Sequence, residues 1–193
     1  MQRICVFAGS NRGTRKEYPL AAEDLGKELL ARGLGLVYGG SSVGLMGMVA
    51  DSVLEGGGEV IGVMPRSLTS KEIGHRGLTA LHEVGSMHER KAMMADLADG
   101  FIALPGGFGT FDELFEILTW AQLGIHQKPI GLLNSAGYFD PLLSFVQHVS
   151  QEGFIREEHL GLLLRAEKAD QLLEQLAAYT PVYSTKWSDL PQR

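Results

Sequence analysis

The sequence predicts a doubly wound α/β domain, in which helices cover both faces of a parallel β-sheet. Short apolar runs alternate with stretches of helical periodicity along almost the whole chain. The apolar runs are continuous, as in Ile4–Phe7 and Phe101–Leu104, which is typical of parallel strands buried on both faces. Glycine-rich turns follow three of the runs, at Gly9–Gly13, Gly39–Gly47 and Pro105–Thr110.

Each expected element follows from its local pattern. Short apolar runs predict strands at Arg3–Ala8, Gly35–Tyr38, Glu59–Met64, Gly100–Leu104 and Pro129–Leu133. Longer segments with apolar residues at helical spacing predict helices at Pro19–Arg32, Leu45–Leu54, His88–Ala98, Thr110–Leu123, Phe139–Gln151 and Asp170–Tyr179. The segment Pro65–Ala80 interrupts this alternation and is expected to be a long connection, a feature that is often functional.

Length and composition bound the kind of protein. The 193 residues suit a single domain, which we expect at residues 1–180, with an irregular tail at 181–193. The 17 Lys and Arg residues against 23 Asp and Glu residues give a net charge of −6, which predicts no nucleic-acid surface. No apolar stretch reaches the roughly 18 residues that span a bilayer, so we expect a soluble cytoplasmic protein without a membrane partner. The lone Cys5 predicts a buried thiol and no internal disulfide.

The three glycine-rich turns indicate a phosphorylated ligand. In a doubly wound sheet, ligands bind outside the carboxyl ends of the strands, where these turns are expected. Backbone N–H groups at the helix N-termini that follow can approach a phosphate closely, with help from the helix dipole. No turn is a G-x-G-x-x-G fingerprint after the first strand or a Walker A loop. The simpler interpretation is that each turn only reverses the chain.

A carboxylate on the helix after the Pro105–Thr110 turn is the first candidate for chemistry. Thr110 and Glu113 have the spacing of a capping box, in which Glu113 would have a purely structural role. The predicted helix is apolar around most of its girth, however, and leaves only a narrow polar stripe of Asp112, Glu113, Glu116 and Thr119. Carboxylates on a buried helix need an ion-pairing partner or a functional role, because an unpaired buried charge is costly.

A candidate partner for the Glu113 carboxylate lies upstream in the sequence. Ser86 and Glu89 again have capping-box spacing, and they place Arg90 and Lys91 in the first helical turn. The helix dipole disfavours cations there, so an anionic ligand or an opposing carboxylate is the better explanation for this pair.

These two segments carry a resemblance to a known family. Pro105–Glu113 resembles the PGGxGTxxE motif, and Met87–Ala92 the companion MHxRKA segment, of the LOG ("Lonely Guy") family of cytokinin riboside 5′-monophosphate phosphoribohydrolases. The similarity extends to Gly39–Gly47 and Thr119–Gly124. It implies a Rossmann-like homodimer, with its active site near the interface, that hydrolyses the N-glycosidic bond of nucleoside 5′-monophosphates such as AMP without a cofactor.

The resemblance also implies a set of site residues. Arg90 and Glu113 would be catalytic. The substrate would contact Glu72, Lys91, Gly107, Phe108, Gly109, Thr110, Phe111, Asp112 and Thr119. The apolar side chains of Met93, Met94, Phe115 and Trp120 could face a second subunit or only the core.

The chemistry of the bond gives the pair its roles. Breaking a sugar–base bond passes through an oxocarbenium-like state, which the Glu113 carboxylate could stabilise, or it could activate water. The departing base accumulates negative charge, which the Arg90 guanidinium could stabilise. Phosphate held by the Gly107–Thr110 amides would fix the ribose in place.

Other functions stay open. Gly40–Gly44 matches the G-x-S-x-G pattern of a serine hydrolase with Ser42 as nucleophile, although no histidine is marked out as its base. A non-catalytic nucleotide sensor could use the same fold. Base preference, AMP against N6-substituted cytokinin nucleotides, cannot be predicted from these motifs.

Two further classes are disfavoured. The histidines are scattered and form no H-E-x-x-H motif, so no metal site is expected. Similar proteins have been labelled lysine decarboxylases, which would need pyridoxal phosphate on a Schiff-base lysine. Lys91 has an electrostatic explanation, and the remaining lysines are expected to be solvated: Lys16, Lys27, Lys71, Lys128, Lys168 and Lys186.

Overall fold

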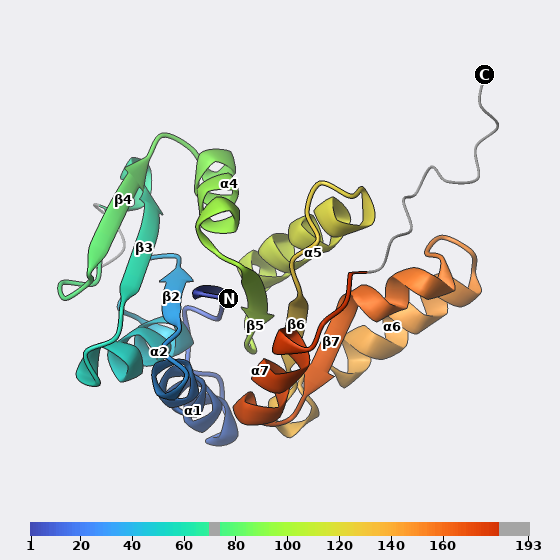
Figure 1. Cartoon of the computed structure of the whole chain (residues 1–193), viewed down its shortest axis with the longest axis horizontal. Helices are drawn as coiled ribbons and strands as arrows, with labels where there is room; N and C mark the ends of the chain where they lie inside the picture. The colour runs from blue at the N-terminus through green and yellow to red at the C-terminus, as the bar shows by residue number, and fades with distance from the viewer. Residues whose placement is uncertain (70–73, 182–193) are drawn as a thin grey trace.

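The computed structural model describes residues 1–69 and 74–181. Within these residues, seven parallel strands form one sheet in the order β4-β3-β2-β1-β5-β6-β7 (Figure 1), which confirms the predicted α/β fold. The strands are β1 (Arg3–Phe7), β2 (Gly35–Tyr38), β3 (Val60–Pro65), β4 (Ala80–Val84), β5 (Gly100–Ala103), β6 (Ile130–Leu133) and β7 (Leu163–Ala166).

Helices cover both faces of the sheet (Figure 1). The helices are α1 (Glu17–Ala31), α2 (Gly44–Glu55), α3 (Arg66–Thr69), α4 (Met87–Leu97), α5 (Phe108–Gln122), α6 (Asp140–Gln151) and α7 (Ala169–Ala177), with 3₁₀ turns at Ser135–Gly137 and Glu157–Leu162. On β1, Ile4 and Val6 join the core under α1, α2 and α7, whereas Cys5 and Phe7 join the core under α4 and α5. This alternation buries both faces of the strand, as its continuous apolar sequence predicts.

The sequence analysis missed both edge strands. Three of the five β4 residues are exposed, and the sequence Ala-Leu-His-Glu-Val carries no continuous apolar run. β7 is only four residues long and includes Arg165. Edge strands tolerate polar side chains because one side of the strand stays open, so their pattern is weak. The predicted connection Pro65–Ala80 therefore also contains α3 and the first residue of β4.

The other predicted elements begin and end within two residues of the observed ones. No helix in the described part of the chain is long and apolar enough to cross a membrane. Of the tail predicted at 181–193, only Pro181 is among the described residues.

The glycine-rich turns after β1, β2 and β5 meet at one edge of the sheet. The N–H of Gly9 donates to the carbonyl of Pro105 at 3.1 Å, and the N–H of Leu45 donates to the carbonyl of Gly9 at 2.9 Å. Gly44 has a φ of +64°, and a Cβ there would lie 2.2 Å from the backbone of Ser10. β1 and β5 are neighbours in the sheet, and the chain winds outward from them in opposite directions, which makes their carboxyl ends the topological switch point.

Candidate active site

The α4 and α5 helices bring the two predicted catalytic side chains together. Nη2 of Arg90, in the first turn of α4, lies 3.4 Å from Oε1 of Glu113 on α5. The side chains are 10% and 11% exposed, so the pair is largely withdrawn from water. The sequence analysis expected an anionic ligand or an opposing carboxylate for Arg90 and Lys91, and the structure places a carboxylate opposite Arg90.

The local sequence holds Arg90 in place. Ser86 caps α4 by accepting a hydrogen bond from the N–H of Glu89 at 3.1 Å, as the spacing predicts. The guanidinium packs against the turn after β2, where a Cβ on Gly39 would lie 2.0 Å from Nη2 of Arg90. Nη1 contacts Sδ of Met87 at 3.8 Å, whereas the buried Nε has no partner among the described residues. Arg90 therefore carries a buried donor, unpaired within the described part of the chain, beside its ion pair.

Burial raises the pKa of Glu113 to about 7, although the charge of Arg90 opposes this shift. The neighbouring Asp112 and Glu116 carboxylates raise it further, and Lys91 lowers it. A carboxyl group with a pKa near neutrality is suited to acid–base work.

The capping-box role considered for Glu113 is wrong. The α5 helix begins at Phe108, so its N-cap is Gly107 rather than Thr110, and no side chain caps it. Thr110 instead packs beneath the turn, where a Cβ on Gly106 would lie 2.0 Å from its hydroxyl oxygen. Thr110 and Glu113 therefore both lie inside the helix rather than at its cap, and Glu113 faces Arg90.

Lys91 joins α4 to α5 beside the pair. Its ammonium nitrogen lies 3.1 Å from a carboxylate oxygen of Asp112 and 3.1 Å from one of Glu116. Burial opposes the charged form, but these hydrogen bonds outweigh it and raise the pKa of Lys91. Lys128, expected to be solvated, instead donates to the carbonyl of Ala95 at 2.8 Å because it lies partly under α4. Lys71 and Lys186 lie outside the described residues.

A small cavity of about 200 Å³ opens at the switch point, beside the turn after β5. Its wall includes Gly106, Gly107, Arg12 and Tyr138. A Cβ on Gly107 would meet nothing within 4 Å, so the backbone of the turn faces open space. Sequence reasoning singled out the Gly9–Gly13 turn but gave Arg12 no role of its own, and it missed Tyr138, which lies outside the recognised motifs.

The residues predicted to contact substrate divide into groups. Gly107, Phe108 and Gly109 are exposed at the rim of the turn, and Phe108 is 94% exposed. Thr110 is buried beneath the turn, and the Phe111 side chain packs against the core, so only their backbones are near the opening. Glu72 lies outside the described residues.

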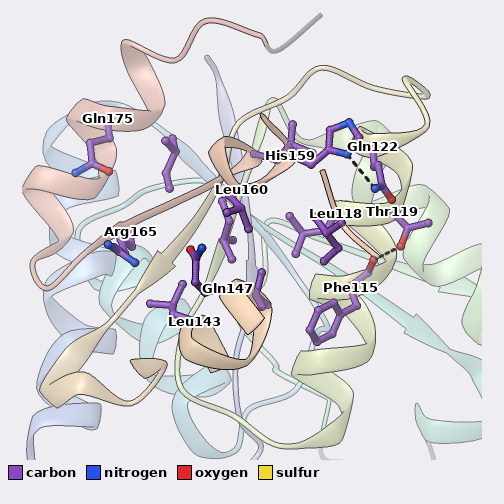
Figure 2. A pocket seen from close by; sticks show the side chains of 15 residues that line it. Phe115, Leu118, Thr119, Gln122, Leu143, Gln147, His159, Leu160, Arg165 and Gln175 are labelled. Carbon is purple, nitrogen blue, oxygen red and sulfur yellow. Dashed lines mark hydrogen bonds between the residues drawn. The ribbon is translucent and has the colours of Figure 1, made fainter. Parts of the chain in front are cut away.

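Thr119 lies apart from this group. It follows Glu113 by six positions on α5, which places it roughly 120° around the helix and about 9 Å further along its axis. Its hydroxyl donates to the carbonyl of Phe115 at 2.7 Å. Both residues line a second cavity of about 470 Å³, walled mainly by α5, α6 and the segment before β7 (Figure 2). Within one chain, Thr119 therefore lines a different cavity from the glycine turn, and neither Arg90 nor Glu113 lines either of these two cavities.

The four apolar residues that were expected either in the core or at a subunit interface differ in their burial. Met94 is buried, and Met93 and Trp120 are packed partly buried against the same core. Phe115 is 40% exposed at the mouth of the second cavity, next to Thr119 (Figure 2).

Ser42 lacks the geometry of a nucleophile elbow. Such a serine sits on a sharp, strained turn between strand and helix. Among the described non-glycine residues only Ala136 has a positive φ; at this turn the positive φ angles belong to Gly40 and Gly44. The glycines take up the strain, so Ser42 is not presented as a nucleophile.

Comparisons with known proteins find a family and relatives that match most of the chain. A family model described as "Possible lysine decarboxylase" matches residues 46–176. "Cytokinin riboside 5′-monophosphate phosphoribohydrolase LOG" of Oryza sativa subsp. japonica is 50% identical over 190 residues, which cover 97% of this chain and 78% of that protein. LOG4 of Arabidopsis thaliana, which carries the same enzyme name, is 49% identical over 183 residues, 95% of this chain and 85% of that protein.

A solved structure shares the fold. The molybdenum cofactor carrier protein from Chlamydomonas reinhardtii superposes with a TM-score of 0.69 at 23% identity, over 92% of this chain and 99% of that one. At this identity the likeness concerns the fold alone.

Proposed function

The chain belongs to the LOG family of cytokinin riboside 5′-monophosphate phosphoribohydrolases, and we propose that its Arg90–Glu113 pair hydrolyses the N-glycosidic bond of purine riboside 5′-monophosphates. The reaction consumes one water and yields the free base and ribose 5-phosphate. The observation that carries the proposal is the buried contact between Arg90 and Glu113, one helical turn from the open glycine turn.

Arg90 and Glu113 carry opposite charges, which suit the heterolytic cleavage of a sugar–base bond. As the sugar–base bond breaks, its electron pair leaves with the base, and the sugar becomes cationic at the anomeric carbon. The Glu113 carboxylate stabilises that cation or accepts a proton from the attacking water. The Arg90 guanidinium stabilises the negative charge of the departing base and, at its high pKa, keeps its own proton. The base then takes up a proton from solvent.

The glycine turn supports a phosphate site. The first N–H groups of a helix have no partner within the helix and point toward an anion. At the start of α5 no side chain caps them, and Arg12 adds a positive charge to the wall of the adjoining cavity. Phosphate bound there would place the ribose next to Glu113, which follows Gly109 by one helical turn.

We infer that the enzyme is a homodimer whose site draws on both subunits. Phe108, Phe115 and Thr119 lie on one exposed face of α5, because their spacing of seven and four residues returns to the same side of a helix. If two α5 helices packed antiparallel about Phe115, the Thr119 of one subunit would lie level with Phe111 of the other, about one helical turn from its Phe108. This pairing reconciles the implied role of Thr119 with its separation from Glu113.

The decarboxylase description of the family model does not suit the lysines described here. A Schiff-base lysine must lose its proton, which requires a lowered pKa. Two carboxylates raise the pKa of Lys91 instead.

Incubation of the purified protein with AMP and, separately, with its N6-isopentenyl derivative tests the proposed reaction. Chromatography should detect free base and ribose 5-phosphate in equal amounts, and the ratio of the two kcat/KM values gives the base preference. Saturable binding of both nucleotides without product would instead make the protein a nucleotide sensor. Ester hydrolysis that is lost in Ser42→Ala would favour the serine hydrolase.

A further inference from the structure

We infer that Tyr138 is a positioning residue for the substrate phosphate, acting through the Gly106–Gly107 peptide. The inference rests on the proposed function, because it concerns the group that this turn holds. The Tyr138 hydroxyl donates a hydrogen bond to the carbonyl oxygen of Gly106, and Tyr138 lies in the wall of the small cavity at the switch point.

The orientation of one peptide plane links Tyr138 to the ligand. The peptide bonds among the described residues are trans, so the carbonyl and the N–H of each peptide point in opposite directions. When Tyr138 holds the Gly106 carbonyl, it fixes the direction of the Gly107 N–H on the other side of the same plane. A Cβ on Gly107 would meet nothing within 4 Å, so there is room for a ligand at this point.

Three successive carbonyls of the turn are held in this way. The Pro105 carbonyl accepts from the N–H of Gly9, and the Gly107 carbonyl accepts from the N–H of Phe111, at 3.1 Å each. The Gly106 carbonyl between them accepts from the Tyr138 side chain. The N–H groups of Gly107, Phe108 and Gly109 have no acceptor among the described residues, so the turn presents its donors outward.

Tyr138 is the side chain in this arrangement that a substitution can remove without altering the backbone of the turn. Its own position is well determined. The N–H of Phe139 donates to the side-chain oxygen of Asn134 at 2.7 Å, and the side-chain nitrogen of Asn134 donates to Asp140 at 2.7 Å. The rings of Tyr18 and Phe139 pack edge-on against the Tyr138 ring, at centroid distances of 5.6 and 4.9 Å.

Tyr138→Phe tests the inference, because it keeps the ring and removes only the hydroxyl. Inhibition constants for ribose 5-phosphate and for adenine would be measured on the wild type and the variant, together with KM and kcat for AMP. We expect about tenfold weaker binding of ribose 5-phosphate and a similar rise in KM, the size of effect that one hydrogen bond produces. Adenine binding and kcat should be unchanged, and the melting temperature should fall by no more than about 4 °C, the shift that the loss of one hydrogen bond produces in a chain of this size.

Tyr179→Phe is the matched control, because Tyr179 follows α7 and does not line this cavity. Both inhibition constants should stay within about twofold. Equal weakening of adenine and ribose 5-phosphate in Tyr138→Phe, or no change in either, overturns the positioning role. Failure of the wild type to bind either ligand, by contrast, contradicts the proposed function itself.

Discussion

Arg90 in the first turn of α4 and Glu113 in the second turn of α5 face each other, with Nη2 and Oε1 3.4 Å apart and both side chains nearly buried. The pair is not a simple salt bridge, because burial raises the pKa of Glu113 to about 7 despite the adjacent guanidinium. A carboxylate that has lost its hydration to this degree is stabilised by a second positive charge, and a cationic transition state supplies that charge. The ion pair in the free protein is therefore consistent with a site prepared for an oxocarbenium-like state.

The pH dependence of kcat/KM should show the titration of Glu113. The carboxylate is the active form, and it is lost by protonation below a pKa of about 7. The value of kcat/KM for AMP should therefore level off above pH 7 and fall about tenfold for each pH unit well below it. Rates measured from pH 5 to 9 check this, and a profile that is flat down to pH 5 would contradict it.

Arg90→Ala tests whether Glu113 causes the low-pH limb of the profile, which is the fall of kcat/KM below about pH 7. The charge of Arg90 lowers the pKa of Glu113, so its removal should move the limb of the residual activity to higher pH. Protonation of the substrate phosphate, near pH 6, would not shift with this substitution. An unmoved limb would assign the titration to the substrate or to another group.

Gly39→Ala should abolish most of the activity, although it replaces no charged residue. The new Cβ would lie 2.0 Å from Nη2 of Arg90, so the guanidinium has to leave its place opposite Glu113. We expect kcat for AMP to fall about a hundredfold or more, as for the loss of a group that stabilises developing charge. In the control Gly77→Ala the Cβ meets nothing nearer than 3.6 Å, and activity should be kept. Full activity in Gly39→Ala would show that the observed position of Arg90 is not needed.

Mixing two inactive variants tests whether the site is shared between subunits. Subunits with Glu113→Gln and subunits with a bulky Thr119→Trp would each form inactive homodimers. In the mixed dimer, one of the two sites combines an intact Glu113 with an intact Thr119. After subunit exchange, about a quarter of wild-type activity should return. Activity that stays at the sum of the separate variants would place all site residues within one chain.

The sequence predicts the fold well where strands are buried on both faces. The continuous apolar runs around Ile4 and Phe101 belong to the central strands β1 and β5, and burial on both sides leaves no freedom for polar residues there. The strands β4 and β7 were missed because one side of each is open, so His82, Glu83 and Arg165 are tolerated.

The site could be predicted only in part. The charges of Arg90 and Lys91 at a helix N-terminus indicate an anionic ligand or a nearby carboxylate, and the structure places Glu113, Asp112 and Glu116 opposite them on α5. The capping-box alternative for Glu113 depended on where α5 begins, and spacing alone does not determine whether Gly107 or Thr110 is the N-cap. Gly39 and Tyr138 act through tertiary contacts with Arg90 and Gly106, which leave no local signal in the sequence.

The central claim is that Glu113 takes part in breaking the sugar–base bond, and Glu113→Gln tests it most directly. Adenine release from AMP would be followed by chromatography, and AMP binding by calorimetry, with the exposed Glu174→Gln on α7 as control. The account predicts that turnover falls at least about a hundredfold while the dissociation constant for AMP changes little, because the amide keeps the shape but not the charge or basicity. Turnover equal to that of the control would contradict it and leave Glu113 as a structural partner of Arg90.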